Sequence, residues 1–360
     1  MKNIKSLPLL LSLGVLLSLN SCSNKAKEAS KEQVPQTVYA SNVIPFFNHW
    51  NLILGDGSNA GIANNYEHED FFYTVKDGEE DWVVYKSPNA GDTHGTSNNT
   101  RSELAQLKKW YPATADDKLT ATLKVMNVSA TGDARVASTH AVVVGQIHSA
   151  DGHENEPLKI FYKKFPGHTK GSVFWHYEIN TAGDDNTGRW DYSTAVWGHD
   201  FSVVGSEADT YPEEPTEGIA LGEEFSYEIV VKDGIMNLKF TSEGHETKTF
   251  TKNLIVSEYA TTADMPKQTQ DLFLPIGQDG VEREQAYTGE GLFFKLGAYN
   301  QTNGKSPDVN KNWCSGAETH DGDIKKQYED GNYAEVWFKT ASISVSDGAV
   351  SNQGYFTKND

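Results

Sequence analysis

Strict alternation of apolar and polar residues is the feature that most constrains how this chain folds. It is clearest at residues 119–125, where Leu, Ala, Leu and Val alternate with Thr, Thr and Lys. A period of two puts every apolar side chain on the same face of an extended strand. The segment is therefore predicted to be a half-buried β-strand, with one face in a core and the other facing outward.

Similar strand-like segments recur along the chain. The runs 225–231 and 235–240 flank Asp233-Gly234, and Asp-Gly between two strands is a strong hairpin signal. After the first residues there is no long amphipathic helix, no internal repeat and no regular exchange of strands with helices. We therefore predict an all-β fold, an antiparallel β-sandwich of the jelly-roll type with a concave groove. The other predicted strands are residues 82–85, 141–148, 158–163, 173–179, 291–301 and 334–345.

Two long segments, 180–222 and 302–331, lose the alternation and are rich in Gly, Asp and Thr. We predict that both are loops. Loops of this length in a compact domain usually have a function and often cover a binding groove. The alternative is that they only cap the ends of the sandwich.

The N-terminus has the features of an export signal. Lys2 and Lys5 precede an apolar run over residues 7–19, which predicts a secretory signal peptide and is too short for a membrane-spanning helix. The run ends in Leu-Asn-Ser-Cys, which resembles the lipobox of bacterial lipoproteins, so we expect Cys22 to carry lipid. Ordinary cleavage near Ser21, with Cys22 left free, is the alternative.

The chain is thus expected to consist of a signal peptide (1–22), a polar and flexible tether (23–38), one folded domain (39–348) and a C-terminal tail (349–360). We expect an exported monomer, lipid-anchored in a bacterial membrane. Whether it faces the periplasm or the cell surface is left open.

Charge and residue usage limit the partners. The net charge of −19 argues against nucleic acid, but it does not exclude an acidic sugar, because binding depends on local clusters of Arg and Lys. The 11 histidines show no metal-ligand spacing, so we expect no cofactor and no catalytic metal, with a structural cation left open.

If Cys22 is lipidated, Cys314 has no partner for a disulfide. We interpret Cys314 as a packed thiol, and the alternative is that it is a nucleophile.

Three short segments present polar groups on one face of a predicted strand. Taken singly, each has an ordinary explanation, such as a surface ion pair or a structural histidine. A glycine in the third segment marks a place where a ligand could approach the backbone closely. Because residues two apart share a face, the three sets are Arg101 and Glu103; Gln146 and His148; and Lys295, Gly297, Tyr299 and Gln301.

Together and in this order, the segments resemble polysaccharide lyase family 7, the alginate lyases. The family motifs are R-[ST]-E-L-R, Q-[IV]-H and Y-F-K-x-G-x-Y-N-Q, and this chain has R-S-E-L-A, Q-I-H and F-F-K-L-G-A-Y-N-Q. Residues 156–162 and 169–172 are also similar, and the resemblance covers residues 40–346. It implies a jelly-roll enzyme that cleaves the 4-O-glycosidic bond of alginate by β-elimination and leaves 4,5-unsaturated uronate ends.

Two positions depart from the family pattern. Ala105 stands where the second arginine of the first motif is common, so one positive contact to substrate is missing. Phe293 stands where a tyrosine is common, which removes a hydroxyl group but keeps the ring. The first departure affects the details of substrate binding rather than the reaction.

The resemblance gives the motif residues chemical roles. Arg101 and Gln146 stabilise the negative charge that develops on the uronate carboxylate when the C5 proton is removed. Tyr299 donates a proton to the leaving oxygen, and either His148 or Tyr299 is the base. Syn elimination at mannuronate needs only Tyr299, whereas anti elimination at guluronate needs His148 on the opposite side. Substrate contacts are expected from Glu103, Lys295, Asn300 and Gln301.

Fine specificity is less well defined. In the family, isoleucine at the position of Ile147 is associated with guluronate-containing sites. The predicted loop 180–222 could wall off one end of the groove and favour exolytic release of short products from chain ends, while endolytic action is the alternative.

Other functions stay open from the sequence. The substrate could be another polyuronate, of the glucuronan or ulvan type. A glycoside hydrolase would need two carboxylates flanking the bond, and the acidic run 67–70 lies in a loop-like stretch. A non-catalytic carbohydrate-binding jelly roll would use Tyr299 and His148 only as contact residues.

Overall fold

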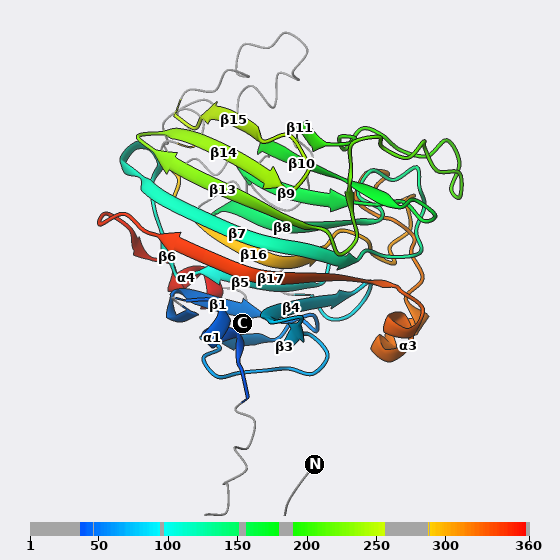
Figure 1. Ribbon diagram of the computed structural model, residues 1–360, viewed down its shortest axis with the longest axis horizontal. Helices are drawn as coiled ribbons and strands as arrows, with labels where there is room; N and C mark the ends of the chain where they lie inside the picture. Colours follow the sequence, from blue (N-terminus) through cyan, green and yellow to red (C-terminus); the bar gives the residue numbers. More distant parts are fainter. Residues whose placement is uncertain are drawn as a thin grey trace, which may run out of the picture. The chain divides into compact units, whose positions relative to one another are not determined.

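The computed structural model describes residues 37–45, 47–93, 97–150, 156–179, 190–255, 287 and 289–357. The described residues from Val38 onward form one compact unit. Within it, antiparallel strands build two large sheets that pack face to face, and short helices lie at the periphery (Figure 1). The predicted antiparallel β-sandwich is confirmed.

The first sheet, sheet A, has nine strands in the order β11-β10-β9-β8-β16-β5-β1-β2, with β12 paired to β10. Strands β8 to β11 follow one another in sequence, whereas β16 enters late and lies between β8 and β5. The strands are β1 (Trp50–Ile53), β2 (Asn59–Gly61), β5 (Arg101–Gln106), β8 (Ala141–Ser149), β9 (Leu158–Lys163), β10 (Lys170–Ile179), β11 (Trp190–Trp197), β12 (Ile219–Ala220) and β16 (Leu292–Asn300).

The second sheet, sheet B, has seven strands in the order β15-β14-β13-β7-β17-β4-β3. These are β3 (Phe72–Asp77), β4 (Glu80–Pro88), β7 (Asp116–Asn127), β13 (Glu224–Lys232), β14 (Ile235–Ser242), β15 (Lys248–Asn253) and β17 (Tyr333–Ser344). The smaller elements are β6 (Lys108–Lys109), β18 (Val350–Ser351), the helices α1 (Ala40–Val43), α3 (Ile324–Glu329) and α4 (Gln353–Thr357), and the 3-10 turns η1 (Phe47–His49), η2 (Pro112–Thr114) and η3 (His320–Gly322).

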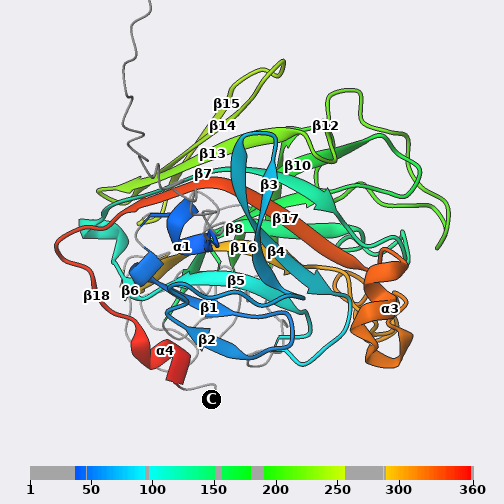
Figure 2. The same ribbon diagram turned by 60° about the horizontal axis from the view of Figure 1, so that its bottom comes forward.

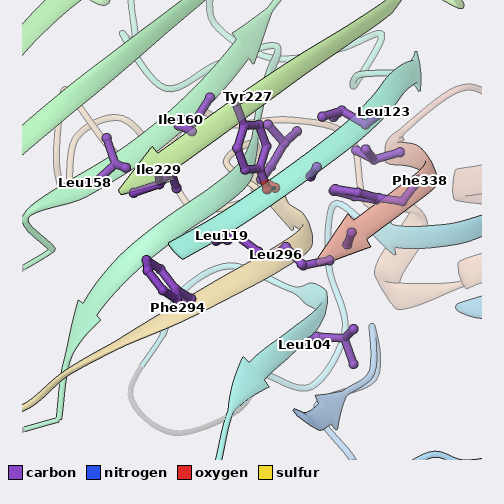
Figure 3. Packing of buried hydrophobic residues seen from close by; sticks show 14 of the residues in the cluster. Leu104, Leu119, Leu123, Leu158, Ile160, Tyr227, Ile229, Phe294, Leu296 and Phe338 are labelled. Carbon is purple, nitrogen blue, oxygen red and sulfur yellow. Dashed lines mark hydrogen bonds between the residues drawn. The ribbon is translucent and has the colours of Figure 1, made fainter. Parts of the chain in front are cut away.

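The hydrophobic core lies between the two sheets. In β7 the alternating residues Leu119, Ala121, Leu123 and Val125 are all buried, as the sequence predicted. They meet the inward residues of sheet A, and this layer is seen from close by in Figure 3. Burial of these side chains is the main favourable term for the fold, at about 25 cal/mol for each Å² of apolar surface removed from water.

The predicted hairpin at Asp233-Gly234 is also confirmed. Lys232 pairs with Ile235, so only these two residues form the turn. Both have positive φ, 49° and 80°. Asp and Gly adopt this left-handed conformation more readily than other residues, and it suits the twist of a two-residue hairpin.

The prediction of an unbroken loop over residues 180–222 is wrong, because β11 and β12 both lie within it. Strand β11 pairs with β10 along its length. Its sequence, W-D-Y-S-T-A-V-W, mixes polar and aromatic residues, so pairing to a neighbouring strand, rather than hydrophobic alternation, defines it. In the second predicted loop, 302–331, the short helix α3 begins after Asp323, whose side chain accepts a hydrogen bond from Lys326 N.

Most of the predicted C-terminal tail (349–360) is not a tail, since β18 and α4 lie within residues 350–357 and pack on the domain; residues 358–360 lie outside the described residues. Figure 2 shows β18 and α4, in red, at this end of the chain. The signal, the tether up to residue 36 and Cys22 lie outside the described residues. In the part of the chain that the structure describes, no helix has the length and apolar character needed to cross a bilayer.

Candidate active site

Three neighbouring strands of sheet A bring the predicted site residues together. On one side of β16, Tyr299 pairs with Arg101 of β5. On its other side, Lys295 pairs with Gln146 of β8, and Phe293 pairs with His148. The side chains of these residues lie on the face of sheet A that is turned away from sheet B, which we call the outer face.

An irregularity in β8 sets the position of Gln146. The pairing of β8 with β9 shifts between Val143 and Gly145. Val144 lies in the core between the sheets, whereas Val143 belongs to a small cluster on the outer face. Gly145 also faces the core, because an added Cβ would lie 2.6 Å from the hydroxyl oxygen of Tyr227. This bulge lets Val143 and Gln146 share the outer face although they are three positions apart in the sequence.

Glu103 is the centre of the site. Its carboxylate lies 2.6 Å from Lys295 Nζ and 3.6 Å from Arg101 Nη1, and it accepts a hydrogen bond from Gln146 Nε2. Glu103, Gln146 and Lys295 are each at most 3% exposed. Two cations therefore share one carboxylate, which leaves a positive charge in this cluster that an anionic ligand can balance.

Arg101 connects this cluster to Tyr299. Its guanidinium carbon lies 3.9 Å from the centre of the Tyr299 ring, a cation–π contact that orients both groups. Burial acts to lower the pKa of Arg101, but Tyr299 and Glu103 outweigh this effect and raise it, so the positive charge is retained. Among the described residues, no group accepts a hydrogen bond from the buried Nε of Arg101.

The hydroxyl group of Tyr299 lies 3.1 Å from Ser97 Oγ. Either oxygen can donate this hydrogen bond, so Ser97 can hold the phenol in place in both its protonated and deprotonated forms. Ser97 was not predicted as a site residue, because it lies outside all three motifs.

Lys295 differs from an ordinary lysine. Burial lowers its pKa to about 8, with Glu103 opposing this effect and Arg101 adding to it. The ammonium group is therefore charged at neutral pH and loses its proton under mildly alkaline conditions.

His148 is held as a neutral imidazole at neutral pH. Burial lowers its pKa to about 4, although Glu156 acts in the opposite direction. Nδ1 lies 2.6 Å from the carbonyl oxygen of Ser149 and donates to it, since a carbonyl only accepts. The lone pair is then on Nε2, which lies 3.4 Å from Glu156, and this polarity suits a general base.

Charged residues continue beyond His148. Glu156 lies 3.0 Å from Lys159 Nζ, which in turn lies 2.7 Å from Glu178. The ring of His148 also packs against Phe293 and Tyr355, with centroid distances of 5.2 and 5.6 Å. Neither Glu156 nor Tyr355 was predicted as a site residue: the first lies outside the motifs, and the second lies in the segment taken for a tail.

Asn300 requires a correction. It is fully buried, and its amide nitrogen donates to the carbonyl oxygens of Ser87 and Pro88 and to Asn89. Its side chain therefore joins β16 to sheet B instead of lying on the outer face with Tyr299. Gln301, the other predicted contact after this strand, is 4% exposed, and its amide lies 3.4 Å from Tyr299 O.

Gly297 has a different role from the one expected. Its φ is 146°, and an added Cβ would lie 2.4 Å from the carbonyl oxygen of Ser102. The close approach that requires glycine here is therefore to the neighbouring strand β5 and not to a ligand.

Two further predictions concern residues away from this cluster. Cys314 is a buried free thiol, and burial raises its pKa, as suits a packed side chain. Among the residues that the structure describes, no group of three or more His, Cys, Asp or Glu is arranged to hold a metal ion.

Known proteins match the chain along most of its length. A sequence model of the family described as "Alginate lyase" matches residues 44–345. The crystal structure of the exolytic PL7 alginate lyase AlyA5 from Zobellia galactanivorans is 61% identical, covers 86% of this chain and 98% of its own, and superposes with a TM-score of 0.78. An alginate lyase from Klebsiella pneumoniae is 28% identical over 280 residues, which are 69% of this chain and 76% of that protein.

The crystal structure of an alginate lyase from Klebsiella pneumoniae has the same fold. It is 22% identical, covers 84% of this chain and 96% of its own, and gives a TM-score of 0.55. The family match spans well over half of the chain, and the residues of all three motifs gather on adjacent strands. On this basis the chain belongs to the alginate lyase family.

Proposed function

We propose that this enzyme cleaves the 4-O-glycosidic bond of alginate by β-elimination, preferring guluronate-containing sites and releasing short products from chain ends. The observation that carries the reaction is the buried cluster of Arg101, Lys295 and Gln146 around one carboxylate, Glu103. Its excess positive charge suits the carboxylate of a uronate. A hydrolase would instead need two carboxylates on either side of the bond.

The first chemical step is removal of the C5 proton of the uronate. The carboxylate next to C5 gains negative charge as this C–H bond breaks, and donors aimed at it lower the barrier. Arg101, whose side chain is 11% exposed, supplies charged donors. Gln146 has a second amide proton besides the one that it gives to Glu103.

In this reaction His148 is the base and Tyr299 is the acid. His148 takes the C5 proton on Nε2, the electron pair forms the C4–C5 double bond, and the C4–O bond breaks. The hydroxyl group of Tyr299 protonates the leaving oxygen. This assignment uses two groups on separate strands, as anti elimination at guluronate requires, and it is the basis for proposing guluronate-containing sites.

Ile147 supports this preference only indirectly. It is fully buried in the core between the sheets, on the opposite face from Gln146 and His148. It therefore has no direct contact with a substrate on the outer face, and any influence acts through the positions of its two neighbours.

The exolytic mode has two kinds of support. The relative that is 61% identical is described as exolytic. In addition, Phe201, from the segment after β11, packs on the same outer-face cluster as Tyr299 and stacks on Trp313 at 5.1 Å. This segment covers the outer face beside the proposed acid, where a long chain would otherwise extend.

The reaction is tested by following ultraviolet absorbance on alginate, because only a lyase creates a conjugated double bond. Tyr299→Phe keeps the ring over Arg101 but removes the proton, so turnover should fall by roughly 10²–10⁴-fold, with little change in substrate affinity. Tyr73→Phe, in β3 of sheet B, is the matched control and should retain activity.

No rise in absorbance on guluronate-rich alginate, mannuronate-rich alginate, glucuronan or ulvan would exclude a polyuronate lyase. A rise only on glucuronan or ulvan would move the substrate to that polymer. Sizing the products over time distinguishes exolytic from endolytic action, since chain-end cleavage gives short products from the start.

We also propose that the mature protein is a monomer, exported and lipid-anchored in a bacterial membrane through Cys22. The support is the basic and apolar N-terminus followed by Leu-Asn-Ser-Cys. Metabolic labelling with a fatty acid should mark the wild-type protein but not Cys22→Ser. Light scattering of the domain lacking residues 1–36 should give the mass of one chain.

A further inference from the structure

The C-terminal segment is attached to the end of β5. Strand β18 pairs with β6, which immediately follows β5 in the chain. The next residue, Asn352, donates from its backbone to Leu107 O at 2.8 Å and from its side chain to Gln106 O at 3.3 Å. These bonds fix the place where α4 begins.

From this attachment, two aromatic side chains of α4 reach over the outer face of sheet A. Tyr355 packs against Phe293 of β16 at 4.9 Å and against His148 of β8 at 5.6 Å between ring centroids. Phe356 is only 4% exposed and belongs to one apolar cluster with Phe293 and with Ala105 of β5. The two rings therefore cover the same end of three adjacent strands.

We propose that α4 forms the end wall of the substrate site beside His148, with Tyr355 as a positioning and specificity-determining residue that limits how many uronate units extend past the base. This proposal rests on the proposed lyase function. It assigns to α4 a part in exolytic action that is separate from the segment around Phe201.

Space and charge both support this assignment. Ala105 lies on the same face as Arg101 and Glu103, and its small side chain leaves room that Phe356 fills. A sugar ring cannot occupy that volume while Phe356 is there. Tyr355 is also among the groups whose electrostatic effect raises the pKa of Arg101.

The orientation of His148 depends on the same contacts. Phe293 and Tyr355 both pack against its ring, at interplanar angles of 34° and 65°. Nδ1 is held by Ser149 O. Removing the Tyr355 ring should therefore admit water to the imidazole and loosen the direction of Nε2, even though Tyr355 itself takes no proton.

The first test shortens the chain after Asn352 and compares it with a control that lacks only residues 358–360. If α4 is an end wall, the shortened enzyme should give longer oligosaccharides from alginate. The fall in viscosity of the alginate solution for each double bond formed should be several-fold larger with the shortened enzyme, while the control behaves as wild type. Unchanged product sizes in a folded, shortened enzyme overturn the proposal.

Point variants decide the matter if the shortened chain does not fold. Tyr355→Ala should raise the pH of the acid limb of kcat/KM and lengthen the products, whereas Tyr355→Phe, which keeps the ring, should leave both near wild type. A folded Tyr355→Ala enzyme with the wild-type pH profile and product sizes overturns the proposal. A wild-type enzyme that forms no double bonds on any polyuronate overturns the proposed function itself, a result distinct from normal double-bond formation with unchanged products.

Discussion

The carboxylate of Glu103 lies 2.6 Å from the ammonium group of Lys295, and both side chains are almost completely buried. Glu103→Gln would leave Lys295 and Arg101 as neighbouring buried cations without their shared counterion. Breaking a buried ion pair in this way costs about 3–5 kcal/mol. Urea unfolding of Glu103→Gln should show a loss of this size.

The double variant Glu103→Gln with Lys295→Met should recover part of the stability, because it removes one of the two unpaired charges. Asp116→Asn is the matched control. It breaks the exposed pair with Lys232, and surface pairs contribute little. Equal losses from the single and the double variant would show that the pair itself is not the source of the effect.

A second prediction concerns the acid limb of the pH–rate profile. Since burial lowers the pKa of His148 to about 4, kcat/KM on guluronate-rich substrate should stay high down to about pH 4. His148→Asn should abolish this activity but spare mannuronate sites, where Tyr299 suffices. An acid limb near pH 6.5, the ordinary value for histidine, would contradict the buried neutral base.

The same shifts predict how stability depends on pH. Burial lowers the pKa of both His148 and His140 to about 4, from 6.5. The unfolded chain therefore binds these protons first, so stability is complete above pH 6.5 and is lost as pH falls towards 4. Each histidine accounts for roughly 3 kcal/mol.

His140 separates this effect from catalysis, because it lies away from the site, with Nδ1 bonded to Ser129 O. His140→Gln should flatten the loss of stability between pH 6.5 and 4, measured by urea unfolding, and leave the pH–rate profile unchanged. An unchanged slope would mean that His140 does not supply this dependence.

The two-residue period of strands predicted the sandwich, whereas the site residues were predicted from the resemblance of three motifs to those of the alginate lyases. The period places Arg101 with Glu103 and Gln146 with His148 whatever the surroundings. It gave no sign of the bulge between Val143 and Gly145, which shifts the register by one residue.

Other features were missed for a different physical reason. The positions of Tyr355 and Glu156 depend on contacts between segments far apart in the chain, and no local pattern encodes these. Asn300 was wrongly predicted to contact substrate because it lies in the same motif as Tyr299. The alternation of side chains along the strand turns Asn300 to the opposite face from Tyr299. A stricter use of the period would have avoided this error.

At alkaline pH, the affinity for substrate should depend on the protonation of Lys295. Its pKa is lowered to about 8 by burial, so the positive charge that helps to hold the uronate carboxylate is lost as pH rises through 8. KM should increase above this pH in the wild type. Lys295→Arg, whose guanidinium does not titrate in this range, should keep a low KM to higher pH. The same rise in both enzymes would exclude Lys295 as its cause.

Ala105 and Phe356 give the last prediction, because they share one apolar cluster on the outer face. Ala105→Arg would force a large cation under the buried Phe356 ring. Overpacking alone costs about 1–3 kcal/mol, and burying the charge without a partner adds to this. Thermal unfolding should show a clear loss of stability for Ala105→Arg, whereas Ala195→Arg, at an exposed position of β11, should change little.

Shortening the chain after Asn352 removes Phe356, so it should restore most of the stability lost through Ala105→Arg. If the shortened variant stays equally destabilised, Phe356 is not what excludes an arginine from this position.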